Sequence, residues 1–174
     1  APFYLSAGGI LCSIIGSALV STKDDTTGDV QGRLLLAIRK GIMGAAGINV
    51  LVGALVIFLL FDPLTQAWAI FLCFVIGLVA GVLIGLATEY CTSFAYRPTQ
   101  SIAEAGLTGA ATVIIKGLSV GMISTVAPVV IIVLSILFSV MLGEFAGGKD
   151  QPGSGIYGIA IAAVGMLSTL GVTL

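Results

Sequence analysis

The run Ala67–Ala87, AWAIFLCFVIGLVAGVLIGLA, contains no charged side chain. As an α-helix it would measure about 31 Å, which is enough to cross the ~30 Å hydrocarbon core of a bilayer. Comparable apolar runs occur near residues 3–20, 41–61, 124–142 and 156–174. None of them alternates with the two-residue period of a membrane β-barrel. The sequence therefore predicts an all-α membrane protein, a multi-span transmembrane helix bundle with about four full spans and a fifth interrupted at Leu174.

The composition agrees with this class. Hydrophobic residues make up 58% of the chain and charged residues 9%, whereas about a quarter of the residues of a soluble domain are charged. The mean hydropathy is +1.19. The formal net charge of −1 gives no reason to expect a nucleic-acid partner. There is no histidine, and the three cysteines lie in or beside apolar runs without the spacing of a metal site, so we expect neither a metal site nor a disulfide framework.

The polar stretch TEYCTSFAYR, residues 88–97, follows the first run directly and contains a single carboxylate. Four residues at intervals of four share one helical face leading to it: Gly77, Gly81, Gly85 and Glu89. Glycines at this spacing allow close helix packing, so we expect this face to contact protein rather than lipid. An ionisable residue facing the interior of a membrane bundle typically belongs to an ion pathway. We therefore predict that Glu89 serves ion translocation or coupling; the alternative is a solvated carboxylate in the headgroup layer.

Residues 102–120 are apolar but carry Glu104 and Lys116, so we expect a partly buried or interfacial helix there rather than a full crossing. We interpret Lys116 as an interfacial anchor, the alternative being a counter-charge for Glu104 or Glu89. Residues 1–174 are predicted to form a single transmembrane region.

Two further side chains in the apolar runs carry expectations. Pro63 stops the preceding helix and places Trp68 at a membrane boundary, where aromatic side chains are enriched. Asn49 is polar within an apolar run, so we expect it to bond to a neighbouring group.

Basic residues indicate the orientation of the chain. If the connections after the first and third spans lie on one side, that side holds six of the seven basic residues: Lys23, Arg33, Arg39, Lys40, Arg97 and Lys116. The other side holds only Lys149. Because cytoplasmic loops carry such an excess of Lys and Arg, we predict that loops 21–40 and 88–123 are cytoplasmic and that loops 62–66 and 143–155 face the opposite side.

Three ordered motifs carry a resemblance to a known family. Thr88-Glu-Tyr-Cys-Thr-Ser precedes Tyr96 and Pro98, Thr108-Gly-Ala-Ala-Thr precedes Gly117-Leu, and Tyr157-Gly-Ile-Ala precedes Gly165-Met-Leu-Ser-Thr. This set resembles the motifs of membrane-integral inorganic pyrophosphatases, pumps that couple pyrophosphate hydrolysis to H⁺ or Na⁺ transport. Before residue 67 the likeness is one of span pattern. The chain departs from the family pattern at Cys91, Val113 and Lys116, where a Tyr, an Asn and a neutral residue are usual.

The resemblance implies that the chain is an internal piece of a longer pump, an inorganic diphosphatase acting as an ion translocase. The parent would bind pyrophosphate through Mg²⁺ at acidic clusters and form a homodimer in the lipid bilayer, where its remaining spans would pack around this piece. Asp24, Asp25 and Asp29 most simply form a solvated turn. We therefore expect no catalytic residue, metal ligand or bound cofactor in this chain, which alone would be inactive.

In the motif, Glu89 stands at the position of the family's acidic residue, which implies a part in ion translocation or coupling. Its polar neighbours are expected to organise the loop through hydrogen bonds, because backbone near a site needs partners. These neighbours are Thr88, Tyr90, Thr92, Ser93, Tyr96 and Arg97.

From the residues alone, two other classes stay open. One is a small channel or transporter subunit in which Glu89 and the glycine face form the conduit. The other is a structural membrane subunit without hydrolase activity. A continuation of the chain into an acidic metal-binding cluster would select the pump.

Overall fold

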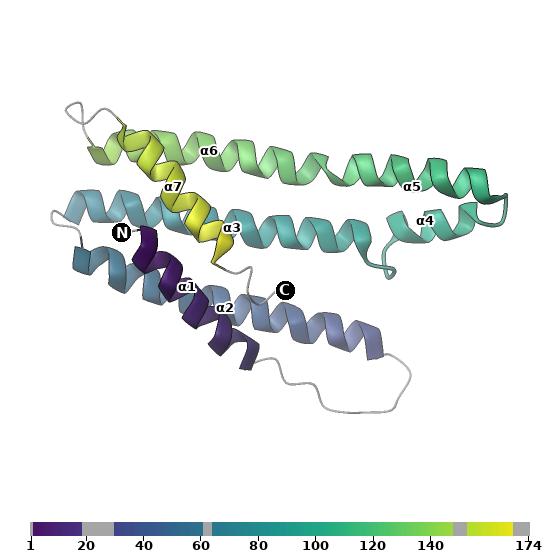
Figure 1. Ribbon diagram of the computed structural model, residues 1–174, viewed down its shortest axis with the longest axis horizontal. Helices are drawn as coiled ribbons and strands as arrows, with labels where there is room; N and C mark the ends of the chain where they lie inside the picture. Colours follow the sequence, from purple (N-terminus) through teal and green to yellow (C-terminus); the bar gives the residue numbers. More distant parts are fainter. Residues whose placement is uncertain (1, 19–29, 61–63, 148–152, 169–174) are drawn as a thin grey trace. The chain divides into compact units, whose positions relative to one another are not determined.

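The computed structural model describes residues 2–18, 30–60, 64–147 and 153–168. All regular secondary structure in these ranges is helical, which confirms the predicted all-α class (Figure 1). The helices are α1 Pro2–Ala18, α2 Val30–Leu60, α3 Leu64–Thr92, α4 Arg97–Ala105, α5 Ala110–Ser124, α6 Val126–Gly147 and α7 Ser154–Leu167.

Three stretches of the described chain are long and apolar enough to cross a membrane: Arg39–Leu60, Gln66–Ala105 and Ala110–Phe145. Within the described residues, α1 and α7 are apolar but shorter, with 17 and 14 residues. The chain is therefore a multi-span helical membrane protein, as its composition predicted.

Two helix boundaries differ from those expected. Helix α2 begins at Val30, well before the apolar run at 41, because the intervening Leu, Arg and Lys residues are good helix formers, although the Arg and Lys are charged. The single helix expected over 102–120 is instead divided between α4 and α5. The division lies at residues 106–109. Gly109 has a φ of 133°, a backbone conformation that residues other than glycine rarely adopt.

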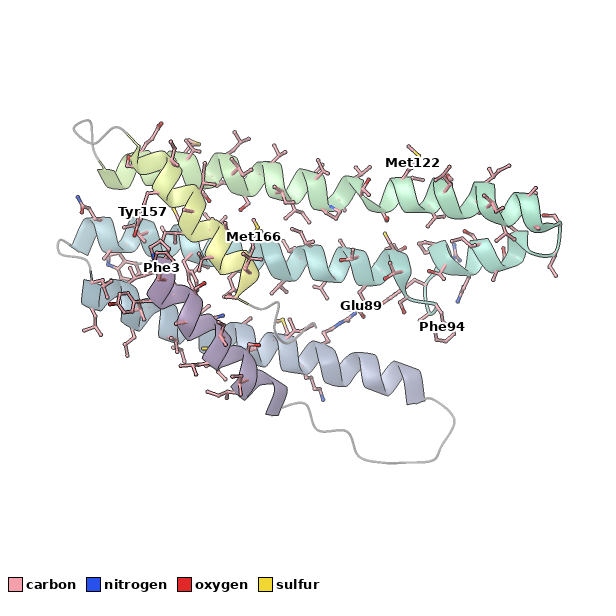
Figure 2. The ribbon with its side chains drawn as sticks, in the orientation of Figure 1. Phe3, Glu89, Phe94, Met122, Tyr157 and Met166 are labelled. Carbon is pink, nitrogen blue, oxygen red and sulfur yellow. The ribbon has the colours of Figure 1, made fainter. Side chains whose placement is uncertain are left out.

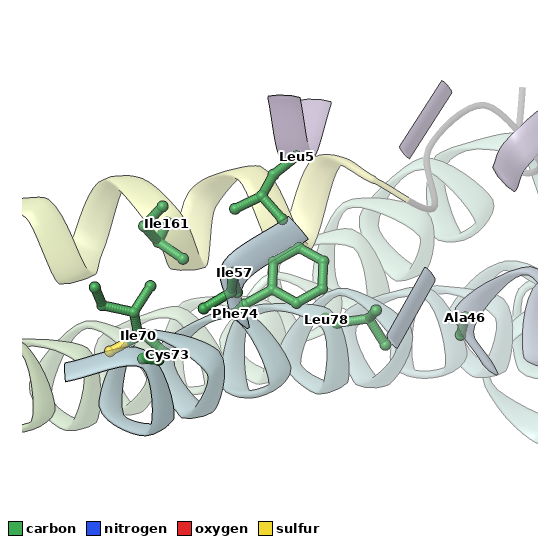
Figure 3. Packing of buried hydrophobic residues seen from close by; sticks show 9 residues of the cluster. Leu5, Ala46, Ile57, Ile70, Cys73, Phe74, Leu78 and Ile161 are labelled. Atoms are coloured by element: carbon green, nitrogen blue, oxygen red, sulfur yellow. The ribbon is translucent and has the colours of Figure 1, made fainter. Parts of the chain in front are cut away.

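The chain divides into two compact units. One comprises Ala1–Val82 and Ser135–Leu174, and the other comprises Leu83–Leu134. The first unit contains the buried apolar core, to which α1, α2, α3 and α7 each contribute (Figure 3). Its most deeply buried large apolar side chains are Leu5, Ile57, Phe74 and Ile161.

Helix α7 packs in the first unit through glycines that meet backbone rather than side chains. A methyl group on Gly77 of α3 would overlap the carbonyl group of Ala162. On α7, a methyl group at Gly165 would lie 2.5 Å from the carbonyl oxygen of Phe74, and one at Gly158 would lie 2.6 Å from that of Ser139 on α6. Such distances are shorter than carbon–oxygen contact allows, so α7 approaches α3 and α6 as closely as it does only because these residues are glycine.

Polar side chains in this unit are buried too. Ser135 and Ser139 on α6 and Asn49 on α2 are at most 3% exposed. Among the described residues, neither serine hydroxyl has a hydrogen-bond partner, and the amide nitrogen of Asn49 has none, so the bond expected for that nitrogen is not seen there. The thiol of Cys73 donates to the carbonyl oxygen of Ser139, with sulfur and oxygen 3.7 Å apart.

Aromatic side chains lie where α2 ends and α3 begins. The rings of Phe58 and Trp68 meet edge to face with centroids 5.1 Å apart, and Phe71 lies 6.1 Å from each of them. Trp68 is 54% exposed. This exposed aromatic cluster at one end of the apolar helices is typical of the membrane–water boundary.

The second unit contains the end of α3, then α4, α5 and the start of α6. Neither α4 nor α5 has a buried residue within the described chain. The two helices contact each other across the turn at 106–109. The loops of this unit, which include the polar motif, are closed by hydrogen bonds.

Candidate functional site at the end of α3

Glu89 lies in the last turn of α3 and is half-buried (Figure 2). The helix ends three residues later at Thr92, and the amide of Ser93 still donates to the carbonyl oxygen of Glu89, at 2.9 Å. Trp68 and Glu89 are separated by about 32 Å of helix axis, close to the ~30 Å thickness of the hydrocarbon core. The length of α3 therefore suits a carboxylate at one membrane boundary and an aromatic cluster at the other.

The two threonines of the motif bond to α3 itself. The hydroxyl of Thr88 donates to the carbonyl oxygens of Ile84 and Gly85, the latter at 3.2 Å. The hydroxyl of Thr92 donates to the carbonyl oxygen of Thr88 at 2.7 Å. Bonds of this kind satisfy hydroxyl groups within the helix and compete with its final backbone bonds. Glu89 is the carboxylate of this turn.

After Thr92, the loop closes on itself through tyrosine rings and one serine. The rings of Tyr90 and Tyr96 lie 4.9 Å apart between centroids, with 47° between their planes. The amide of Tyr96 donates to the carbonyl oxygen of Ser93 at 3.3 Å, and the amide of Ala95 donates to the Ser93 hydroxyl at 3.5 Å. Arg97 begins α4 and is exposed.

Two residues that the sequence reasoning missed fasten α4 back onto this loop. The hydroxyl of Thr99 donates to the carbonyl oxygen of Cys91 at 3.2 Å. The amide group of Gln100 donates to the carbonyl oxygens of Phe94 and Ala95, both at 3.4 Å. The available signal was Pro98, because a proline in the first helical turn places the next polar residues beside the preceding loop.

The Thr-Gly-Ala-Ala-Thr motif forms the turn between α4 and α5. The hydroxyls of Thr108 and Thr112 donate to the carbonyl oxygen of Ala105 at 2.8 and 2.9 Å. The two hydroxyl oxygens also lie 2.8 Å from each other. The carbonyl at the end of α4, which has no partner within its own helix, is thus satisfied by these side chains and by the backbone amide of Thr108, at 3.2 Å. Glu104 and Lys116 on these helices are exposed.

The glycine series of α3 has different surroundings at its different positions. Gly77 and Gly81 face backbone atoms of Ala162 and Met166 on α7. Around Gly85, an added methyl group would meet nothing within 4 Å. The close approach expected along this face is therefore present at the first two glycines in the described structure.

The described residues hold no group of three or more His, Cys, Asp or Glu side chains that could bind a metal ion. The carboxylates they contain are Glu89, Glu104 and Glu144. The aspartates at 24, 25 and 29 lie outside the described residues, as do parts of loops 21–40, 62–66 and 143–155. The arrangement offers one half-buried carboxylate in a hydrogen-bonded loop, which can carry a charge or a proton at a helix end.

Comparison with known proteins adds the family context. A family model described as inorganic H⁺ pyrophosphatase matches residues 1–174. A putative K⁺-stimulated pyrophosphate-energized sodium pump of Bacteroides thetaiotaomicron is 46% identical over 178 residues, which cover 100% of this chain and 23% of the pump. A K⁺-insensitive pyrophosphate-energized proton pump of Methanosarcina mazei is 38% identical over 171 residues, which cover 98% of this chain and 23% of the pump. The chain thus spans about a quarter of the length of these relatives.

Proposed function

Because the chain belongs to the family of inorganic H⁺ pyrophosphatases, we propose that it is one membrane section of a pump that couples pyrophosphate hydrolysis to cation transport. The match over the whole chain is the observation that carries this proposal. Its relatives include pumps named for sodium and pumps named for protons, so the proposed cation is Na⁺ or H⁺. The test is pyrophosphate-driven uptake of each cation into vesicles that contain the complete protein. Hydrolysis without uptake of either cation would contradict the proposal.

Hydrolysis itself is proposed to occur outside residues 1–174. Pyrophosphate held through Mg²⁺ requires several hard oxygen ligands, usually carboxylates, around the phosphoryl group. The described residues provide no such cluster and do not fit a magnesium–pyrophosphate site. The role of this section is to supply membrane scaffold and a residue of the ion path or of its coupling.

Glu89 is the proposed ion-path or coupling residue. The support is its half-buried position in the last turn of α3, directly before a loop that is fixed by bonds from Thr99 and Gln100. Ionisable side chains within transmembrane helices are energetically costly, and where they occur they are usually functional.

The test of Glu89 separates hydrolysis from transport. Glu89→Gln keeps the shape and one acceptor but removes the charge, so we expect less cation taken up per pyrophosphate hydrolysed by the complete protein in vesicles. Glu104→Gln is the matched control, since Glu104 is an exposed carboxylate in the same unit. If Glu89→Gln changed neither hydrolysis nor uptake, Glu89 would have no part in the mechanism.

The orientation of the chain is proposed from its charges. A cytoplasmic position for the loops 21–40 and 88–123 is supported by their basic residues. These two loops hold six Lys and Arg residues, whereas the loops on the opposite side hold one. A membrane-impermeant thiol reagent should therefore label Thr99→Cys only in inside-out vesicles. Labelling in right-side-out vesicles would reverse the orientation.

A homodimer is proposed for the parent on the basis of the motif resemblance. Light scattering of the detergent-solubilised complete protein should give twice the mass of one chain. A mass of one chain would exclude this assembly.

A further inference from the structure

The long apolar stretch Ala110–Phe145 is interrupted where α5 ends and α6 begins (Figure 1). As one straight helix, its 36 residues would measure about 54 Å, nearly twice the ~30 Å hydrocarbon core of a bilayer. Helix α6 alone measures about 27 Å from Val126 to Glu144, which suits the core by itself. We therefore place the interruption where the chain leaves the hydrocarbon core, with α5 continuing beyond it.

Backbone hydrogen bonds of the α-helical pattern are missing at this interruption. The amide of Thr125 donates to the carbonyl oxygen of Ile123, two residues earlier instead of four. Pro128 has no N–H group with which to reach the carbonyl oxygen of Ser124. The amide of Val129 again donates four residues back, to the carbonyl oxygen of Thr125 at 3.2 Å. The helical ladder is thus broken at two places within about one turn.

Two hydroxyl groups bond to the backbone at the break. The hydroxyl of Ser124 donates to the carbonyl oxygen of Gly121 at 2.7 Å, and the hydroxyl of Thr125 donates to that of Met122 at 2.8 Å. Such bonds satisfy freed backbone groups in membrane helices that contain a proline, and they often bend the helix. A hydroxyl rotates about a side-chain bond, so it can follow its acceptor when the helix axis bends, which a backbone amide cannot do.

Helix α5 is fastened to α4 rather than to an apolar core. Neither helix has a buried residue within the described chain, and the two contact each other across a turn that threonine hydroxyls close. At its other end, α4 bonds through Thr99 and Gln100 to carbonyl groups between residues 91 and 95, just after Glu89. Segments with few buried apolar contacts move at low cost in free energy. The bonds of α4 would carry such a movement to the loop after Glu89.

We propose that the break at residues 124–128 is a hinge about which α4 and α5 swing together when the complete protein binds pyrophosphate, so that the loop after Glu89 shifts while α6 keeps its place in the bilayer. The inference rests on the proposed function, because it takes the complete protein to bind pyrophosphate. Hinges are typically a few residues at the end of an element. A change of about 20° at the hinge would move Ile115, about 15 Å from Thr125 along the helix, by about 5 Å.

The test is a pair of distances between spin labels in the complete protein, reconstituted in nanodiscs, with the native cysteines replaced by alanine. One label replaces Leu86 on α3. The other replaces either Ile115, far from the hinge, or Ile123, beside it; all three side chains are exposed. Each distance is measured without ligand and with Mg²⁺ and imidodiphosphate, in which an NH group replaces the bridging oxygen of pyrophosphate. We expect a shift of about 5 Å for position 115 and of about 1 Å for position 123.

A variant at the hinge completes the test. Pro128→Ala supplies the missing amide donor, so the shift at position 115 should fall to that at position 123. Val129→Ala is the matched control, because it changes the next side chain but keeps the proline and both hydroxyl bonds; it should keep the full shift. The comparison of positions 115 and 123 needs no change at the hinge, so it decides the proposal even if Pro128→Ala fails to fold.

Three results would overturn the proposal: no shift at position 115, equal shifts at positions 115 and 123, or a full shift in Pro128→Ala. The readout needs binding of the analogue and not transport. A complete protein that pumps but shows no shift would contradict this inference alone, whereas hydrolysis without uptake of either cation would contradict the proposed function.

Discussion

Gly77→Ala in the complete protein should weaken the packing of α7 against α3. The added methyl group would meet the carbonyl oxygen, carbonyl carbon and Cα of Ala162, which are all backbone atoms. Backbone atoms cannot rotate away as the end of a side chain can, so α7 must move as a whole. Such a movement would also disturb the contact of Gly165 with Phe74 on the same pair of helices.

The expected size follows from two opposing effects. Overpacking in a close-packed interior costs about 1–3 kcal/mol. Replacing a glycine inside a helix by alanine stabilises the folded state by about 0.5–1 kcal/mol, because alanine has the higher helix propensity. The difference leaves a net loss of up to about 2.5 kcal/mol in the free energy of unfolding, and because the added methyl group meets backbone atoms we expect Gly77→Ala to lie in the upper part of this range.

Gly47→Ala is the matched control, because Gly47 lies in α2 of the same unit and a methyl group there would meet nothing within 4 Å. The measurement is the temperature at which half of the detergent-solubilised protein leaves the monodisperse peak on size exclusion. It should fall for Gly77→Ala and stay level or rise slightly for Gly47→Ala. An unchanged or higher midpoint for Gly77→Ala would refute the argument from backbone contact.

Three further predictions concern the loops and the membrane boundary. Thr112→Val should destabilise the complete protein by about 1 kcal/mol, because the carbonyl oxygen of Ala105 loses a hydrogen-bond donor. Thr112→Ser should keep this hydrogen bond, so equal thermal midpoints for the two variants would contradict the prediction. Tyr96→Leu should lower the free energy of unfolding by about 0.5–1.5 kcal/mol, because the ring contact with Tyr90 is lost, whereas Tyr96→Phe should change it little. Thermal midpoints measure both variants, and a large loss of stability in Tyr96→Phe would mean that the hydroxyl group and not the ring matters. The difference in fluorescence between the complete protein and its Trp68→Phe variant reports the emission of Trp68. Lipids brominated near the headgroup should quench this emission most, because Trp68 is exposed and expected at the membrane boundary. Strongest quenching by bromine at the ends of the acyl chains would place Trp68 in the bilayer interior instead.

The sequence was informative about the apolar helices because their lengths are set by the bilayer. Runs such as 67–87 had to be helical to satisfy their backbone in lipid, and the structure contains them within α2, α3 and α6. Their ends were less predictable. Hydropathy marks the part of a helix that lies in lipid, so it missed the polar first turns of α2.

The break between α4 and α5 escaped prediction for a different reason. Its stability comes from the hydroxyls of Thr108 and Thr112 converging on one carbonyl oxygen, that of Ala105. Threonines occur in helices as well as in turns, so their spacing did not reveal the break. The positive φ of Gly109, which also belongs to the break, is not visible in the sequence.

For the candidate site, the motif located Glu89, whereas the next helix was expected only from residue 102 and α4 begins at Arg97. The partners of the loop could not be predicted, since Thr99 and Gln100 reach carbonyl groups five to eight residues earlier in the chain. Likewise, the glycine spacing of α3 indicated that a helix would pack there, but it could not say that the helix would be α7.

The glycines of α7 also determine what kind of force holds that helix. Where Gly77, Gly158 and Gly165 lie, the nearest atoms of the facing helix are backbone carbonyl groups, so main-chain atoms of the two helices pack directly against each other. The attraction between main-chain atoms does not depend on which side chains surround them, but it weakens when the axes of the two helices move apart. Natural variants of this crossing should therefore exchange the outward-facing apolar residues freely while admitting no atom larger than hydrogen at Gly77 or Gly165.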